Sequence, residues 1–207
     1  LNAKIFVNTI DSDFSTQRNF GLSKAKSDWV LFIDADERVS DALAFEISNI
    51  ANQITDQTLG SYMGFFIRRI DYMWGRKLRF GETGGKKFLR LAKKNSGQWK
   101  GKVHETWKIK GRIGELKNPL IHFPHKTFKE FLREINFYTD IRARELHKKG
   151  YRANFASVFF YPLGKFILNY FLKRGFMDGV GGLIIAITMS LHSFLVRGKL
   201  WLLWKMR

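Results

Sequence analysis

Three carboxylates within four positions, Asp34, Asp36 and Glu37, are the part of this chain best suited to chemistry. They directly follow the apolar run at 29–33, whose β-branched and aromatic residues are typical of a buried strand. Because an unpaired buried carboxylate is too costly, the strand must end at Asp34 and deliver these side chains to the carboxyl edge of a sheet. Two carboxylates two residues apart on extended backbone can face one cation. We therefore predict that Asp36 and Asp34 bind Mg²⁺ or Mn²⁺ together with a phosphate.

The alternative is a solvated turn whose polar residues cap the next helix. Ser40 and Asp41 are a helix-start signal, and the apolar residues Leu43 and Ile47 follow at helical spacing. A buried strand, an acidic loop and a helix in this order favour the metal–phosphate site over the turn.

The elements that must position this loop follow from the pattern of apolar residues. Strands are predicted at 4–8 and 29–33, and helices at 13–27 and about 40–53. Strand and helix alternate, which predicts a parallel, doubly wound sheet.

After Gly60 the pattern changes to strands at 62–70, 87–91, 102–109 and 113–121, with a glycine-rich basic loop at 71–87. We expect mixed or antiparallel pairing there. Thr127 then caps a long helix that continues to about residue 149.

The last fifty residues contain two apolar segments, 155–172 and 180–196, flanked by basic residues and by Trp201 and Trp204. Each is marginal for a spanning helix, which needs about 20 apolar residues. Aromatic and basic residues beside apolar helices favour a membrane interface, with a packed soluble appendage or a true membrane span as the alternatives. We expect a core at 1–125 and a helical, membrane-associating appendage at 126–207.

Charge is unevenly distributed along the 207 residues. Residues 1–60 hold five basic and nine acidic residues, whereas residues 61–207 hold 31 and nine, which gives the net charge of +18. A basic surface attracts nucleic acid, anionic lipid headgroups or phosphorylated substrates. The absence of cysteine excludes disulfides and thiolate metal sites. Since a strand-like run begins almost at Leu1, we expect that an amino-terminal segment is missing.

The segments 17–22 (QRNFGL) and 24–40 (KAKSDWVLFIDADERVS) resemble family 2 glycosyltransferases, in particular the lipopolysaccharide core glucosyltransferase-like branch of bacterial enzymes. Arg90-Leu91, the Gly97–Glu105 segment with its Val-His-Glu motif, and the Gly175–Gly179 segment extend the resemblance over essentially the whole chain.

The resemblance implies an α/β fold of GT-A type, with a mixed, mainly parallel sheet flanked by helices. It implies an inverting transfer of a sugar from a nucleotide-diphosphate donor, with a divalent cation as cofactor. The acceptor would be a lipid-linked or cell-envelope glycan, met at the cytoplasmic face of the bacterial inner membrane by a peripheral protein on an anionic membrane surface. The family's first strand–helix–strand, which grips the nucleotide base, has no counterpart here.

Within such a reaction, Glu105 is our candidate general base, with His104 as the competing base, metal ligand or orienting neighbour. Arg90 is a candidate for the donor diphosphate, and Asp34 either joins the metal or binds donor hydroxyls. Further candidates lie near the start of the predicted helix, where the side chains that could meet the donor are those of Gln17, Arg18 and Asn19.

Two other functions compete. A nucleic-acid-binding protein would explain the charge and the aromatic residues, but not an acidic loop after a buried strand or an uncharged tail segment. We expect no nucleic-acid partner. A non-catalytic membrane scaffold is the third hypothesis.

Overall fold

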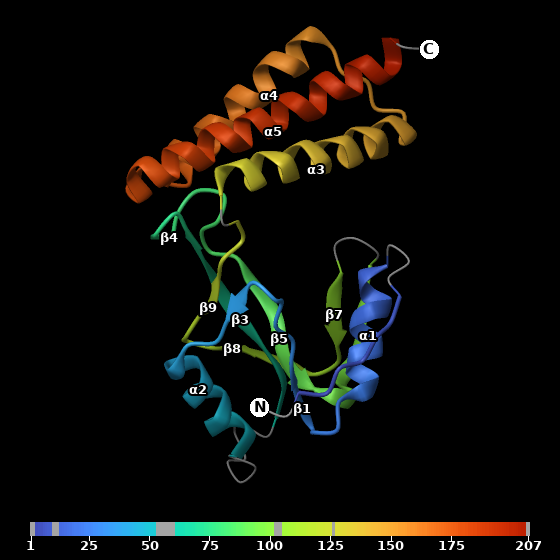
Figure 1. Ribbon diagram of the computed structural model, residues 1–207, viewed down its shortest axis with the longest axis vertical. Helices are drawn as coiled ribbons and strands as arrows, with labels where there is room; N and C mark the ends of the chain where they lie inside the picture. Colours follow the sequence, from blue (N-terminus) through green and yellow to red (C-terminus); the bar gives the residue numbers. More distant parts are fainter. Residues whose placement is uncertain (1–2, 10–12, 53–60, 102–104, 126, 206–207) are drawn as a thin grey trace. The chain divides into compact units, whose positions relative to one another are not determined.

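The computed structural model describes residues 3–9, 13–52, 61–101, 105–125 and 127–205, and these form two compact units (Figure 1). The first unit comprises residues 1–69 and 87–121, and the second comprises 70–86 and 122–207. Segment 70–86 therefore belongs with the helical part of the chain, which a division at 125/126 does not anticipate. Each unit is described by itself.

The first unit is a curved sheet with two helices. Its elements are α1 (Phe14–Lys24), β1 (Trp29–Leu31), β2 (Glu37–Arg38), α2 (Asp41–Asn52), β3 (Tyr62–Met73, which continues into the second unit), β5 (Lys87–Lys93), a 3₁₀ turn (Lys94–Ser96), β6 (Gly97–Lys100), β7 (Thr106–Ile109), β8 (Arg112–Glu115) and β9 (Leu120–His122). The strand order is β1-β5-β3-β9-β2, with β8 beside β3, and β6 and β7 form a separate ribbon.

The predicted parallel, doubly wound start of the chain is wrong in two respects. Residues 4–8 form no strand, and Ile5 is 88% exposed. β1 pairs antiparallel with β5, with Val30 opposite Ala92. Among the strand pairs whose register is described, β3–β8 alone is parallel, so the sheet is not mainly parallel. The mixed pairing expected after Gly60 is confirmed.

The apolar run of β1 is explained by burial on both of its faces. Trp29 and Leu31 pack against a cluster that contains Leu43 of α2. Val30 and Phe32 point the other way, into a cluster that contains Leu22 of α1. An unbroken apolar run shows that both faces of a strand are covered, and such runs are typical of parallel sheets, which is why the pattern predicted one. The run does not specify the direction of the neighbouring strand.

The β6–β7 ribbon closes the second of these clusters. Trp99 and Trp107 lie opposite each other in the register, stack at 5.4 Å between ring centroids, and are buried. Asn19 of α1 ties the helix to the ribbon, because its amide donates to the Trp99 carbonyl and accepts from the Trp99 N–H, both at 2.9 Å.

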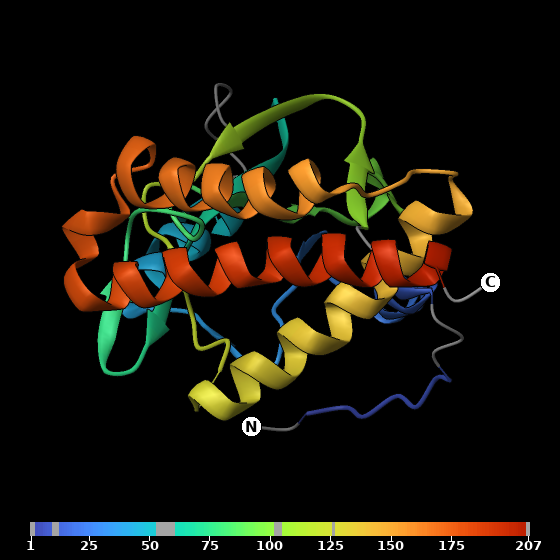
Figure 2. The ribbon, with the colours of Figure 1, turned by 90° about the horizontal axis from the view of Figure 1, so that it is seen from above.

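The second unit consists of a β-hairpin and three long helices. Its elements are the end of β3, β4 (Arg76–Leu78), α3 (Phe128–Lys148), α4 (Phe155–Ile167), a π-helical turn (Leu168–Leu172), a 3₁₀ turn (Gly175–Asp178) and α5 (Gly179–Lys205). Figure 2 shows α4 beside α5, with α3 crossing α5. The predicted Thr127 cap is confirmed, and it forms a reciprocal capping box with Glu130.

Part of the predicted loop at 71–87 is ordered by pairing and by one carboxylate. Residues 71–73 pair with 76–78, and the Asp178 carboxylate accepts from the backbone N–H groups of Arg79 and Phe80. Asp178, which directly precedes α5, therefore caps this loop. His122 is buried and lies 2.7 Å from Asp71, as expected of a hydrogen-bonded core histidine.

Replacing Gly97 by alanine should destabilise the ribbon. An added Cβ would lie 1.9 Å from the Lys108 carbonyl oxygen, so the strands must separate. We expect the free energy of unfolding, measured by urea titration of tryptophan fluorescence, to fall by about 1–3 kcal/mol.

Gly21→Ala is the matched control, because its Cβ would make only an ordinary contact of 3.7 Å with Phe32. On an exposed helix this change should leave stability equal or raise it by about 0.5–1 kcal/mol. Equal effects of the two substitutions would contradict the close approach at Gly97.

Candidate active site

The acidic loop is fastened to β5 by Arg90. The Phe32 N–H donates to the Arg90 carbonyl at 2.9 Å, so the β1–β5 register brings the end of β1 to this residue. The Arg90 Nη2 atom lies 2.5 Å from Asp34 Oδ2 and 3.1 Å from Glu37 Oε1. The Arg90 side chain is only 5% exposed. A buried guanidinium requires such carboxylate partners, because desolvation would otherwise outweigh its interactions.

Glu37 is the interior anchor of the same loop. Its side chain is fully buried, its Oε2 accepts from the Asp34 N–H at 3.0 Å, and Arg69 lies 3.9 Å from its Oε1. The next helix is capped by Ser40, whose hydroxyl accepts from the Leu43 N–H. Glu37 therefore forms salt bridges with Arg90 and Arg69 and does not cap the next helix.

Arg18 joins the two carboxylates that the sequence singled out. Its Nη2 donates to Asp34 Oδ1 at 2.9 Å, and its Nε donates to Glu105 Oε1 at 2.8 Å. The guanidinium lies 4.6 Å from the ring centre of Trp99 and 5.9 Å from that of Phe32, as in cation–π contacts. Arg18 is thus held from three sides.

These groups line a cavity of about 550 Å³ in the first unit. Arg18, Asp34, Arg90 and Glu105 contribute two guanidinium groups and two carboxylates. The aromatic and basic side chains of the wall are Phe66, Lys87, Phe88, Trp99, Trp107 and Lys108. Two guanidinium groups and two carboxylates against an aromatic wall can bind a phosphate and a sugar ring in one place.

The other predicted residues lie elsewhere. Gln17 accepts a hydrogen bond from Asn8, and the Asn19 amide is engaged by the Trp99 backbone, so neither lines the cavity. Asp36 is exposed on the turn and is also absent from the lining. His104 lies outside the described residues.

A divalent cation is compatible with this loop. In the described part of the chain no three or more His, Cys, Asp or Glu side chains gather into a metal-binding group. A cation shared with a diphosphate needs only one or two carboxylates, since substrate and water supply the remaining oxygens. Asp36 offers an exposed carboxylate, and each Asp34 oxygen keeps a lone pair beyond its arginine contact. The carboxylate oxygens of Asp36 and Asp34 therefore fit Mg²⁺ or Mn²⁺, with Asp36 as the principal ligand.

Sequence reasoning missed the aromatic wall and the bridge between helix and loop. Trp99 and Trp107 occupy matching positions on two short strands, and Phe32 packs edge-on against both. In the sequence, these aromatic residues alternate with polar ones, and this pattern could have indicated two strands with one aromatic face. The pattern could not have shown that Arg18 packs against the ring faces.

The electrostatics of the loop favour an ionised Asp34. Partial burial by itself raises the pKa of this carboxyl group, but the charges and hydrogen bonds of Arg90 and Arg18 outweigh burial and hold the pKa below its ordinary value. A charged Asp34 is the form that can orient arginines or bind a cation.

The chain is similar to several known proteins. Residues 1–137 match the family described as glycosyl transferase family 2. The lipopolysaccharide core biosynthesis glycosyltransferase LpsC of Rhizobium meliloti (strain 1021) is 26% identical over 191 residues, which cover 91% of this chain and 69% of LpsC.

Proteins named as uncharacterized glycosyltransferases in Rickettsia are similar over a comparable range. One from Rickettsia prowazekii (strain Madrid E) is 26% identical and one from Rickettsia conorii (strain ATCC VR-613 / Malish 7) is 27% identical, each over 195 residues and 89% of this chain. The chain spans 65% and 68% of their lengths, or about two thirds.

The lowered pKa of Asp34 predicts a loss of stability in acid. Its ion pairs contribute fully above the ordinary value of 3.8, and the contribution disappears as pH falls through the lower folded-state pKa. The free energy of unfolding of Asp34→Asn should therefore lie below that of the wild type near neutral pH and converge with it in strong acid.

Asp28→Asn, which removes an exposed carboxylate at the other end of β1, is the control for this titration. Its free energy of unfolding near neutral pH should stay within about 0.5 kcal/mol of that of the wild type. A constant gap between Asp34→Asn and the wild type at every pH would contradict the pairing of Asp34 with the arginines.

Proposed function

Because the chain belongs to glycosyl transferase family 2, we propose that it transfers a sugar from a nucleotide-diphosphate donor to a lipid-linked or cell-envelope glycan. The observation that carries this proposal is the bridge from Asp34 through Arg18 to Glu105 at the wall of one cavity. It brings together a phosphate-binding loop and a carboxylate able to accept a proton.

In this proposal the first half of the site binds the donor. Arg90 and Arg18 supply donors for the diphosphate oxygens, and Asp34 keeps both guanidinium groups in position. Asp36, with Asp34 as the second ligand, would hold a divalent cation. When bound, such a cation acts as a Lewis acid that neutralises the departing diphosphate.

The second half activates the acceptor. Inverting transfer is a single displacement at the anomeric carbon, so an acceptor hydroxyl must lose its proton as it attacks. Glu105 Oε1 is engaged by Arg18, which leaves Oε2 as the oxygen that takes this proton. Through its Nε, Arg18 orients the base, and through its Nη2 it holds Asp34. One side chain would thus fix the position of the donor-binding loop relative to the base.

The second unit supports association with a membrane. Phe155–Leu172 and Gly175–Lys205 are long and apolar enough to cross a bilayer, and only 6% of the most apolar part of the former is buried. Several aromatic residues of α4 are exposed, among them Phe155, Phe159, Phe160 and Tyr161. Three basic residues lie over aromatic rings nearby, in the pairs Arg197–Tyr161, Arg152–Trp204 and Lys205–Trp201. Such a face fits an anionic membrane surface.

The ion pairs of these helices favour an in-plane position over a span. Lys165, within α4, lies 2.9 Å from Glu82 of the loop that follows β4. Lys199 of α5 lies 2.8 Å from Asp140 of the charge-rich helix α3. A bilayer core around either helix would have to admit these charged partners, which is costly. We infer a peripheral protein at the cytoplasmic face of the bacterial inner membrane, where a lipid-linked acceptor is reached.

The catalytic roles predict large losses of activity. Glu105→Gln removes the proton acceptor, and Asp36→Ala removes the cation ligand. Each should lower the rate of sugar transfer by about 10³-fold or more, in the range expected for a base or a charged ligand. Transfer is measured with radiolabelled nucleotide sugars, and circular dichroism checks that the fold is intact.

Asp28→Asn is again the matched control, since it neutralises an exposed carboxylate outside the cavity and should keep wild-type rates. Near-wild-type transfer by the folded Glu105→Gln variant would remove Glu105 from the role of base. The same result for Asp36→Ala would remove the cation site.

Membrane binding is tested by the double variant Phe155→Ala/Phe159→Ala. Both rings are exposed and stack on each other, and their loss removes apolar surface from the bilayer face. Partition onto vesicles that contain phosphatidylglycerol should weaken by about tenfold or more. Phe14→Ala/Phe45→Ala removes two exposed rings from the first unit and should leave partition unchanged. Equal losses of vesicle partition in the two double variants would contradict the assignment of the α4 aromatic face to membrane binding.

A further inference from the structure

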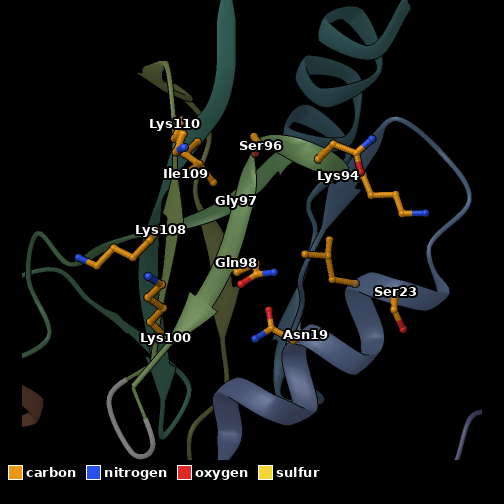
Figure 3. Close-up of a pocket in the computed structure, with 12 residues that line it drawn as sticks. Asn19, Ser23, Lys94, Ser96, Gly97, Gln98, Lys100, Lys108, Ile109 and Lys110 are labelled. Atoms are coloured by element: carbon orange, nitrogen blue, oxygen red, sulfur yellow. The ribbon is translucent and has the colours of Figure 1, made fainter.

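A second hollow of the first unit is a groove of about 730 Å³ between α1 and the β6–β7 ribbon (Figure 3). Asn19 and Ser23 of α1 line one side. Four lysines also line the groove, namely Lys94, Lys100, Lys108 and Lys110, and none of the residues that line it is acidic. None of the roles proposed above uses this groove.

The alternation of the ribbon concentrates these lysines on one face. Trp99 and Trp107 point into the core, so their immediate neighbours on each strand point outward. Gln98 is paired with Lys108, and Lys100 is paired with Thr106, which places two lysines on the outward face. Lys110 lies just beyond the end of β7 and lines the same groove. The inward face thus supports Arg18, while the outward face is basic.

The charge of the groove is uncompensated. Within the described residues, none of the four lysines forms an ion pair, whereas Lys87, Lys165 and Lys199 each lie within 3 Å of a carboxylate oxygen. Several ammonium groups around one hollow repel one another, and an anion placed among them relieves that repulsion.

Three of the neutral polar side chains of the groove are already engaged by the protein. The Ser23 hydroxyl donates to the Phe20 carbonyl, the Ser96 hydroxyl donates to the Lys93 carbonyl, and the Asn19 amide is held by Trp99. Asn95 and Gln98 also line the groove, but its charge comes from the ammonium groups, which act as mobile point charges. Phosphate, with its high charge and several equivalent oxygens, fits such a set better than a planar carboxylate, which matches the guanidinium fork.

The groove adjoins the cavity of the candidate active site. Lys108 and Ile109 of β7 line both hollows, so this strand is their shared wall. We propose that the lysine groove binds phosphate groups of a phosphorylated glycan acceptor whose hydroxyl reaches Glu105. The acceptor assignment rests on the proposed function, but binding of phosphate in the groove can be measured without any transfer.

Lysine acetylation followed by mass spectrometry tests this binding in the whole chain. Glucose 6-phosphate is the probe, and glucose and glucuronate are the uncharged and carboxylate comparisons. We expect glucose 6-phosphate to protect Lys94, Lys100 and Lys110, and to leave the exposed Lys4, Lys26 and Lys129 equally reactive. Glucose and glucuronate should protect much less.

A triple variant provides the second measurement. Lys94→Gln/Lys100→Gln/Lys110→Gln should weaken the binding of glucose 6-phosphate by about tenfold or more at low salt. Lys4→Gln/Lys26→Gln/Lys129→Gln removes the same charge outside the groove and should bind as the wild type does. Lys108 is left unchanged, because it also lines the cavity.

Three outcomes would overturn the proposal: uniform protection of all lysines, equal protection by glucuronate, or protection by phosphatidylglycerol vesicles without protection by the soluble sugar phosphate. Because none of these readouts requires sugar transfer, a groove that binds phosphate in a chain without transferase activity would refute the proposed function and leave the groove intact.

Discussion

The burial of Arg90 is the constraint on which the first unit depends. A guanidinium that is 5% exposed needs carboxylates on its open sides, and Asp34 and Glu37 supply them from one loop. Glu37 is itself fully buried and also accepts the Asp34 N–H, so the loop cannot move without exposing unpaired charge to the interior. In the proposed function this charge cluster would serve structure and donor binding together, because the arginine that holds the loop would also bind the diphosphate.

The β6–β7 ribbon extends this arrangement in two directions. Its tryptophans support Arg18, which connects the loop to Glu105, and its outward lysines line a separate groove. One short ribbon can therefore present a paired, precisely oriented site on one face and an unpaired basic hollow on the other. Because side chains alternate between the two faces of a strand, the ribbon alone separates the cavity with Arg18 from the lysine groove.

The second unit contains charged residues within long apolar helices. Lys165 and Lys199 are paired with carboxylates from a loop and from α3, while the aromatic residues of α4 stay exposed. These helices therefore expose aromatic side chains while their lysines are paired. A bilayer surface, which offers hydrocarbon beside anionic headgroups, matches this division.

The sequence by itself determined the residue types of the site and most of the elements. The acidic loop after an apolar run and the helix capped by Thr127 follow from local patterns, and the candidacy of Arg18, Arg90 and Glu105 follows from the resemblance to family 2 glycosyltransferases. Only the tertiary structure decided that residues 4–8 form no strand, that β1 runs antiparallel to β5, and that the Asn19 amide is engaged by the ribbon backbone. Local spacing reports which side chains are apolar or charged. The direction of a neighbouring strand and the partner of a polar group depend on residues some 60 to 80 positions away, which no local pattern specifies.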